Sequence, residues 1–235
     1  MVKISRADLV VSNGLSLETG WLPSLIRGGR NPRVNPGTKG HLVLGDSAEP
    51  LDIAQGKVTR ASGDVHPEGN PHFMLDPIRV GKLGVVIAER LGELDEPNRA
   101  AYIESARAFQ KDLEEKTKKW DERIKKSGVT KTVTYHNDML YFLERFGVKA
   151  IGFLEPKPGI PPTAQHILSI MDLVKKEKVG VILVENYFDT KIADRLTAEV
   201  PSVKVKVVGI SVGSKPELKT HADVIEQIVQ AIEGK

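Results

Sequence analysis

Residues 179–185 read Val-Gly-Val-Ile-Leu-Val-Glu, an unbroken apolar run that ends in a carboxylate. Such a run, rich in β-branched residues, is typical of a strand that is buried on both faces of a parallel sheet. Similar but shorter patterns lie on both sides of it, and each is followed by a helical pattern. The expected strands are 132–136, 149–154, 179–185 and 203–210, and the expected helices are 138–146, one capped by Thr163, 191–198 and 222–232. This alternation predicts an α/β fold with a parallel sheet and right-handed crossovers.

The first half of the chain is less regular. Its expected strands are 7–12 and 41–44, with a short helix at 17–26 and Gly-, Pro- and Asn-rich loops at 28–40 and 63–71. A sheet of two strands is marginal by itself. We therefore expect the sheet of this half to be incomplete and its open edge to pair with a second copy of the chain or to be poorly ordered.

Two long helices are expected between the halves. Asp76 is a favourable N-cap and Pro77 suits the first helical position, which predicts a helix of about 17 residues. Pro97 opens a second helix that extends to about residue 126, with Phe109 and Trp120 among its inward-facing residues.

Composition excludes several classes of protein. The 235 residues include 34 Lys and Arg against 31 Asp and Glu, so the formal net charge is +3. This small excess does not indicate the concentrated basic surface that nucleic-acid-binding proteins usually have. The absence of cysteine excludes disulfides, thiolate metal ligands and cysteine nucleophiles. No apolar stretch approaches the ~20 residues of a membrane-spanning helix. The N-terminus shows no signal-peptide pattern, so we expect none in this chain.

Polar residues stand at the carboxyl ends of three expected strands, where open parallel sheets bind ligands. They are His136, Glu185 and Ser211. Imidazole and carboxylate together suit a divalent metal. The loop before Asp76 adds His72 and, six residues earlier, His66.

Each of these residues also has a purely structural interpretation. Either His72 or His136 could be a hydrogen-bonded structural residue, Glu185 could cap the helix that begins near residues 189–190, and His66 could be an exposed loop residue. The sequence contains no H-E-x-x-H zinc motif, no phosphate-binding G-x-x-x-x-G-K-S/T loop and no G-x-S-x-G nucleophile elbow.

The chain resembles the metal-binding receptors of zinc/manganese ABC importers, which are extracytoplasmic solute-binding proteins. The matching stretches are RADLVVSNGLSLETGWLPSLI (6–26), GDVHPEGNPHFMLDP (63–77), VTYHNDMLYFLERFGVKAIGF (133–153) and VILVENYFDT (181–190). The resemblance implies two α/β lobes, each a parallel sheet with flanking helices, joined by the long rigid helix that starts at Pro77. It divides the chain into an N-terminal lobe (1–76), a helical segment (77–128) and a C-terminal lobe (129–235).

The same resemblance implies a function without catalysis. A metal ion would be captured in the cleft between the lobes and delivered to an ABC permease. His72 and His136 match the family's ligand positions, and Glu185 and His66 are the candidates for the remaining positions. Imidazole ligands without thiols favour Zn²⁺, with Mn²⁺ as the second choice.

The sequence departs from the family in two places. First, the family's segment with a first pair of strands and an Asp-Pro-His ligand has no recognisable counterpart in this sequence. Second, residues 209–214 (GISVGS), which follow the last expected strand, contain no carboxylate. We therefore expect weaker zinc binding than in an intact receptor. The alternative function is a metal-dependent hydrolase that uses an open zinc position, with Glu185 or Asp138 as general base.

Overall fold

The computed structural model describes residues 1–56, 63, 65–189 and 191–234, and it divides into two compact units. The C-terminal unit contains Leu75–Pro77 and the chain from Glu115 onward, together with Gly63 and Val65. The N-terminal unit contains most of the remaining residues. The boundaries inferred from the sequence, 1–76, 77–128 and 129–235, stay a prediction. Thr190, near the expected start of a helix, lies outside the described residues.

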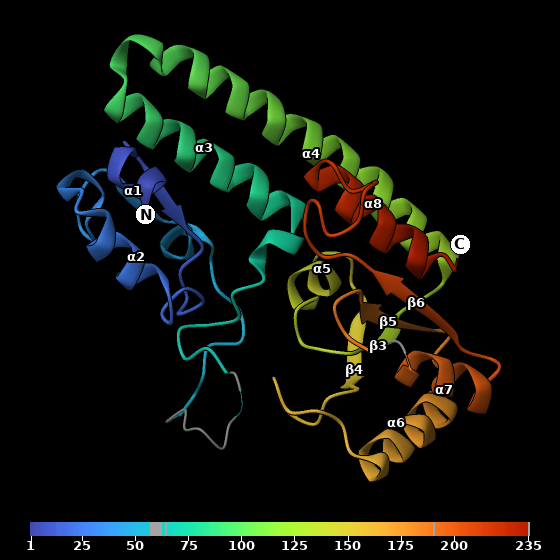
Figure 1. Ribbon diagram of the computed structural model, residues 1–235. Coiled ribbons are helices and arrows are strands. Elements are labelled where there is room, and N and C mark those ends of the chain that lie inside the picture. The colour runs from blue at the N-terminus through green and yellow to red at the C-terminus, as the bar shows by residue number, and fades with distance from the viewer. Residues whose placement is uncertain (57–62, 64, 190, 235) are drawn as a thin grey trace. The chain divides into compact units, whose positions relative to one another are not determined.

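The C-terminal unit is built on a four-stranded, all-parallel sheet with the strand order β4-β3-β5-β6 (Figure 1). The strands are β3 (Lys131–Thr134), β4 (Lys149–Phe153), β5 (Val181–Glu185) and β6 (Lys204–Val208). The helices that alternate with them are α5 (Leu140–Arg145), α6 (Ala164–Glu177), α7 (Lys191–Glu199) and α8 (His221–Ile232). The predicted parallel α/β fold is confirmed, with element ends shifted by a few residues.

The buried strand β5 organises the core of this unit. All five of its residues are buried, and its side chains alternate between the two faces of the sheet. Ile182 and Val184 belong to the apolar cluster formed with α6 and α7, and α8 lies across the opposite face (Figure 1). The predicted cap of α6 is present, because the Thr163 side chain accepts a hydrogen bond from the His166 backbone N–H at 3.2 Å.

The N-terminal unit has a smaller sheet. Among its described residues, β1 (Val10–Ser12) and β2 (His41–Val43) form a two-stranded parallel sheet of three residue pairs. The unit also contains α1 (Val2–Arg6), α2 (Leu22–Gly29) and the short 3₁₀ helices η1 (Pro32–Val34) and η2 (Leu44–Ser47).

The helix expected at 17–26 begins later than predicted, at Leu22. Gly14, Leu15 and Ser16 have φ values of +83°, +51° and +65°, so the backbone after β1 makes a left-handed turn that no right-handed helix can include. Pro23 then lies in the first turn of α2, where its missing N–H costs no hydrogen bond.

Long helices begin near the two prolines as expected. A 3₁₀ turn, η4 (Phe73–Leu75), precedes α3 (Pro77–Leu94), and η5 (Glu96–Asn98) precedes α4 (Arg99–Ser127). Trp120 is buried as predicted. The prediction for Phe109 is wrong, because 39% of this residue is exposed; its ring lies against Gly84, which is too small to cover it. No helix in the described part of the chain is long and apolar enough to cross a membrane.

Candidate metal centre

The strand order of the C-terminal unit defines where a ligand can bind. From β3 the chain continues to β4 at one edge, whereas from β5 it continues to β6 at the other edge. The carboxyl ends of two such neighbouring strands form the crevice in which open α/β sheets bind ligands. His136 follows β3 by two residues and Glu185 is the last residue of β5. The structure therefore brings these two predicted residues to the same crevice.

His136 is held by a carboxylate that the sequence analysis did not single out. Its Nδ1 atom contacts the Oε1 atom of Glu155, and 17% of the His136 side chain and 4% of the Glu155 side chain are exposed. Glu155 also accepts a hydrogen bond from the Gly159 backbone N–H at 3.1 Å. An ionised carboxylate only accepts hydrogen bonds, so this contact favours the neutral His136 ring with its proton on Nδ1 and its lone pair on Nε2.

A pair of buried carboxyl groups lies beside His136. Asp138 and Glu185 are fully buried, and the Tyr187 hydroxyl donates a hydrogen bond to Asp138 Oδ2 at 2.7 Å. Burial raises the pKa of both carboxyl groups, and the neighbouring charge of Asp138 raises the pKa of Glu185 further. The pair therefore tends to retain a proton, since two adjacent carboxylates in an apolar environment repel each other.

The atoms of this pair are available for an additional contact. Among the described residues, Asp138 Oδ1 and both carboxyl oxygens of Glu185 are buried without a hydrogen-bond partner of good geometry. The alternative that Glu185 caps α7 is wrong, because neither of its carboxyl oxygens receives a hydrogen bond from the described part of that helix. The Lys191 backbone N–H donates instead to Asp189 Oδ1 at 3.0 Å.

Aromatic rings form one wall of the crevice. Phe188 stacks on Tyr135 with ring centroids 3.7 Å apart and contacts Tyr187 at 4.5 Å. The centroid of the His136 ring lies 6.5 Å from that of Phe188. The three aromatic rings therefore lie together beside the imidazole of His136.

The N-terminal unit presents His72 in a comparable way. Asn70 Oδ1 accepts the His72 backbone N–H at 3.0 Å and lies 2.9 Å from His72 Nδ1. A backbone N–H can only donate, so the Asn70 atom in this position must be the oxygen. Nδ1 of His72 is therefore the protonated nitrogen, and Nε2 again carries the lone pair.

The turn after β1 anchors the loop that contains His72. Asn13 donates from Nδ2 to the Pro71 carbonyl at 2.8 Å, and Ser16 donates to Glu68 Oε2 at 3.1 Å. The Glu18 carboxylate accepts the backbone N–H groups of Asn13 and Gly14 at 2.7 and 3.0 Å. His66 is half-buried in the same loop, and its carbonyl accepts the Gly69 N–H at 3.2 Å.

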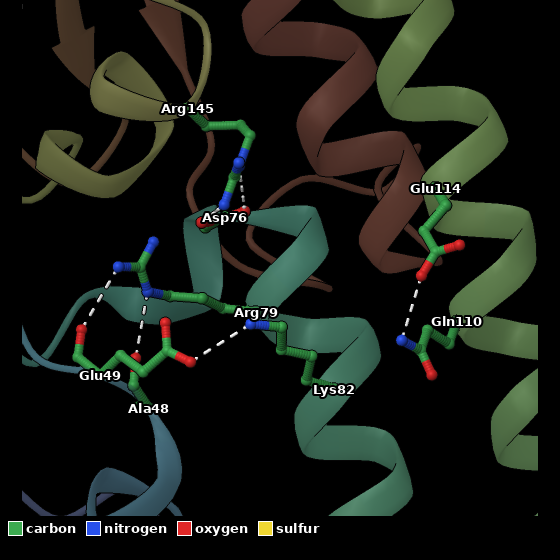
Figure 2. A network of polar contacts seen from close by, with 8 residues as sticks. All are labelled: Ala48, Glu49, Asp76, Arg79, Lys82, Gln110, Glu114 and Arg145. Carbon is green, nitrogen blue, oxygen red and sulfur yellow. Dashed lines mark hydrogen bonds and ion pairs between the residues drawn. The ribbon is translucent and has the colours of Figure 1, made fainter.

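Two arginine side chains form hydrogen bonds with residues close to the start of α3. In the C-terminal unit, the fully buried Asp76 receives two hydrogen bonds from Arg145, at 2.9 Å from Nε and 2.8 Å from Nη2 (Figure 2). In the N-terminal unit, Arg79 donates to the carbonyls of Ala48 and Glu49 at 3.0 and 3.3 Å (Figure 2). The N-cap role expected for Asp76 stays a prediction.

Other histidines, and Ser211, make contacts of a structural kind. His166 Nε2 lies 2.9 Å from the Phe153 carbonyl and His41 Nε2 lies 3.4 Å from Ser12 Oγ. Ser211 is exposed and its carbonyl closes a turn with Ser214. Within the described residues, no group of three or more His, Asp or Glu side chains is arranged to hold a metal ion. His72 in one unit and His136 in the other are the predicted ligands whose Nδ1 atom contacts a side-chain oxygen.

Two residues of this site were missed in the sequence, although signals for both exist. Glu155 directly follows the expected strand 149–154, so it lies at the carboxyl end of a strand, as His136 and Glu185 do. Asn70 precedes His72 by two residues, the spacing at which an Asn side chain accepts a nearby backbone N–H.

Comparison with known proteins assigns the family. Residues 1–234 match the family described as zinc-uptake complex component A, periplasmic. The chain is 23% identical to the high-affinity zinc uptake system protein ZnuA of Bacillus subtilis over 242 residues, which cover 99% of this chain and 73% of that protein. It is 29% identical to the protein of the same name from Brucella abortus over 159 residues, or 68% of this chain and 46% of that protein.

A solved structure agrees with the family in fold. A mutant of the laminin-binding adhesin from Streptococcus agalactiae superimposes with a TM-score of 0.74 and 26% identity, covering 97% of this chain and 82% of the other. The chain thus spans about half to four fifths of the lengths of these proteins. Together with the parallel sheet and the oriented histidines, the match over residues 1–234 shows that this chain belongs to the periplasmic zinc-uptake family of solute-binding transport proteins, which are not enzymes.

Proposed function

We propose that this protein captures Zn²⁺ outside the cytoplasm and delivers it to an ABC-type membrane permease, with Mn²⁺ as a weaker alternative cargo. The family and the names of its zinc-uptake relatives support this function. The alternative of a metal-dependent hydrolase has no support, because the family consists of transport components. Glu185 and Asp138 are therefore not assigned a role as general base.

One observation carries the proposal for this chain. In each unit a histidine has its Nδ1 atom bonded to a side-chain oxygen, from Asn70 at His72 and from Glu155 at His136. This arrangement leaves Nε2 of both rings as the lone-pair nitrogen, the form that binds zinc at about 2.0–2.1 Å. Histidines with a purely structural role do not need the same tautomer.

We propose His72 and His136 as zinc ligands, with Glu185 and His66 as candidates for further positions. Glu185 is supported by its place beside the His136 backbone and by its two carboxyl oxygens, which lack good hydrogen bonds. A metal ion would have to displace the proton that this buried carboxyl tends to hold. His66 is supported only by its place in the loop of His72. This donor set is richer in nitrogen than Mn²⁺ prefers.

Calorimetric titration of metal-stripped protein with zinc tests the proposal. We expect one zinc ion per chain, and His72→Ala and His136→Ala should each abolish or severely weaken binding. His166→Gln is the matched control, because it changes a histidine that contacts a backbone carbonyl and should bind zinc normally. Unchanged affinity in both alanine variants would contradict the ligand assignment.

The same titration ranks the remaining ligands. Glu185→Gln keeps the shape of the side chain and removes the charge, so weaker binding supports Glu185 as a ligand and normal binding removes it from the set. His66→Ala tests the other candidate in the same way. Titration with Mn²⁺ should give a lower affinity than titration with Zn²⁺.

We further propose that the open sheet of the N-terminal unit pairs with a second copy of the chain. The described sheet has two strands, so each strand has one edge outside the β1–β2 pairing, and the backbone groups of such an edge can pair with another strand. Light scattering over a range of protein concentrations should show a dimer. A monomer at every concentration would contradict this pairing and leave the zinc proposal unaffected.

A further inference from the structure

We propose that Glu155 is a positioning residue for His136: its carboxylate selects the Nδ1–H tautomer and strengthens Nε2 as a metal donor. This inference rests on the proposed function, because it assigns His136 a metal to bind. Glu155 belongs to none of the ligand positions considered above. It acts on the metal only through the imidazole ring.

The geometry of Glu155 suits this role. The residue follows β4, whereas His136 follows the neighbouring strand β3, so the parallel pairing of these strands brings the two side chains together. One carboxylate oxygen contacts His136 Nδ1 and the other accepts the Gly159 N–H. Both oxygens are therefore engaged, and the carboxylate cannot rotate without losing a bond.

The turn that supplies the second bond is itself constrained. Gly159 has φ of +74°, a conformation that favours glycine, and Lys157 and Ile160 form an isolated antiparallel bridge around it. This turn directs an N–H group at the second carboxylate oxygen of Glu155. A merely space-filling residue would not require such a support.

The comparison with His72 indicates what the charge adds. His72 has a neutral amide oxygen on Nδ1, which fixes the tautomer without adding charge. His136 has a buried carboxylate in the same position. A charged acceptor forms a stronger bond to Nδ1–H and increases the electron density on the opposite nitrogen. We therefore infer that His136 is the stronger of the two histidine donors.

Nuclear magnetic resonance of the metal-free protein tests the tautomer directly. With ¹⁵N-labelled imidazole rings, His136 should show a protonated Nδ1 and a lone pair on Nε2 in the neutral ring. In Glu155→Ala the population should shift toward the Nε2–H tautomer. A wild-type His136 that is protonated on Nε2 would overturn the proposal.

Zinc affinity tests the consequence for binding. Loss of the hydrogen-bond partner of a metal-binding histidine typically lowers metal affinity by about 10–100-fold, and we expect a loss in this range for Glu155→Ala. Glu155→Gln has the same size but no charge, and it should lose at least about tenfold if the charge matters. Wild-type affinity in Glu155→Gln would overturn the claim that the carboxylate strengthens the donor.

Two controls distinguish a positioning role of Glu155 from a general loss of charge or of structure. Glu177→Ala removes a glutamate of the same unit that pairs with Lys131 at the surface, and it should bind zinc normally. Thermal unfolding of each variant shows whether the fold is retained. If the wild-type protein binds no zinc, the proposed function fails, whereas the tautomer of His136 still decides whether Glu155 positions the ring.

Discussion

The two units support their histidines by different means. In the C-terminal unit, His136 follows a strand of a four-stranded parallel sheet whose strand β5 is entirely buried. In the N-terminal unit, the sheet has two described strands of three residues, and the loop of His72 depends on side-chain hydrogen bonds from the turn after β1. A large sheet positions the ends of its strands through its core, whereas a small sheet needs local polar contacts to hold a loop in place.

The largest expected difference between the units concerns their cores. Ile182→Ala in β5 should lower the free energy of unfolding by roughly 2–5 kcal/mol, because it removes a fully buried side chain from a well-packed sheet. Leu42→Ala in β2 should cost less, since its smaller sheet can relax around the cavity. Urea unfolding is followed through Trp120 in the C-terminal unit and Trp21 in the N-terminal unit. Equal losses would remove the distinction between the two cores.

The second comparison concerns the two arginines near the start of α3 (Figure 2). Arg145→Ala removes two hydrogen bonds from the fully buried carboxylate of Asp76, and we expect a loss of about 3 kcal/mol in stability. Arg79→Ala removes bonds to two backbone carbonyls and should cost about 1 kcal/mol. Chemical unfolding measures both values. A larger loss for Arg79 would contradict this ranking.

A smaller effect is expected from the anchor of the His72 loop. Asn13→Ala removes the bond to the Pro71 carbonyl, which should lower stability by about 1 kcal/mol and weaken zinc binding because Pro71 directly precedes His72. Ser24→Ala removes a surface bond with Arg27 in the same unit and serves as the control. Normal zinc affinity in Asn13→Ala would show that the loop keeps its conformation without this anchor.

The smallest effect should be seen in the acid range. Burial by itself would raise the pKa of Glu226, but hydrogen bonds from Arg123, Trp120 and Gln230 outweigh it and lower this pKa below its ordinary value of 4.5. The resulting stability is present above about pH 4.5 and is lost as the pH falls through the lower pKa of the folded protein. Because Glu226 is partly exposed, we expect less than about 1 kcal/mol.

The unfolding midpoint measured between about pH 3 and 6 tests this assignment. Glu226→Gln should show a shallower decrease toward acid than the wild-type protein. Asp121→Asn, at a surface ion pair with Lys125 in the same unit, is the control and should follow the wild-type curve. Identical curves for wild type and Glu226→Gln would show that Glu226 does not contribute.

Much of the fold was predictable because its signals are local. The apolar run of β5, the Thr163 cap and the proline at the start of α3 each depend on residues close in sequence. The start of α2 was not predicted, because the positive φ values of Leu15 and Ser16 have no reliable signature in these residue types. The exposure of Phe109 depends on a glycine of another helix, which helical periodicity does not report.

The same distinction between local signals and long-range contacts applies to the candidate site. The sequence by itself determined that His136 and Glu185 stand at the carboxyl ends of strands, that His72 precedes a helix, and which family the chain resembles. Only the tertiary structure decided the order β4-β3-β5-β6, which places Glu155 against His136 and Asp138 beside Glu185. Strand order depends on how buried faces pack and on the connections between them, so contacts between strand ends become defined only when the whole sheet has formed.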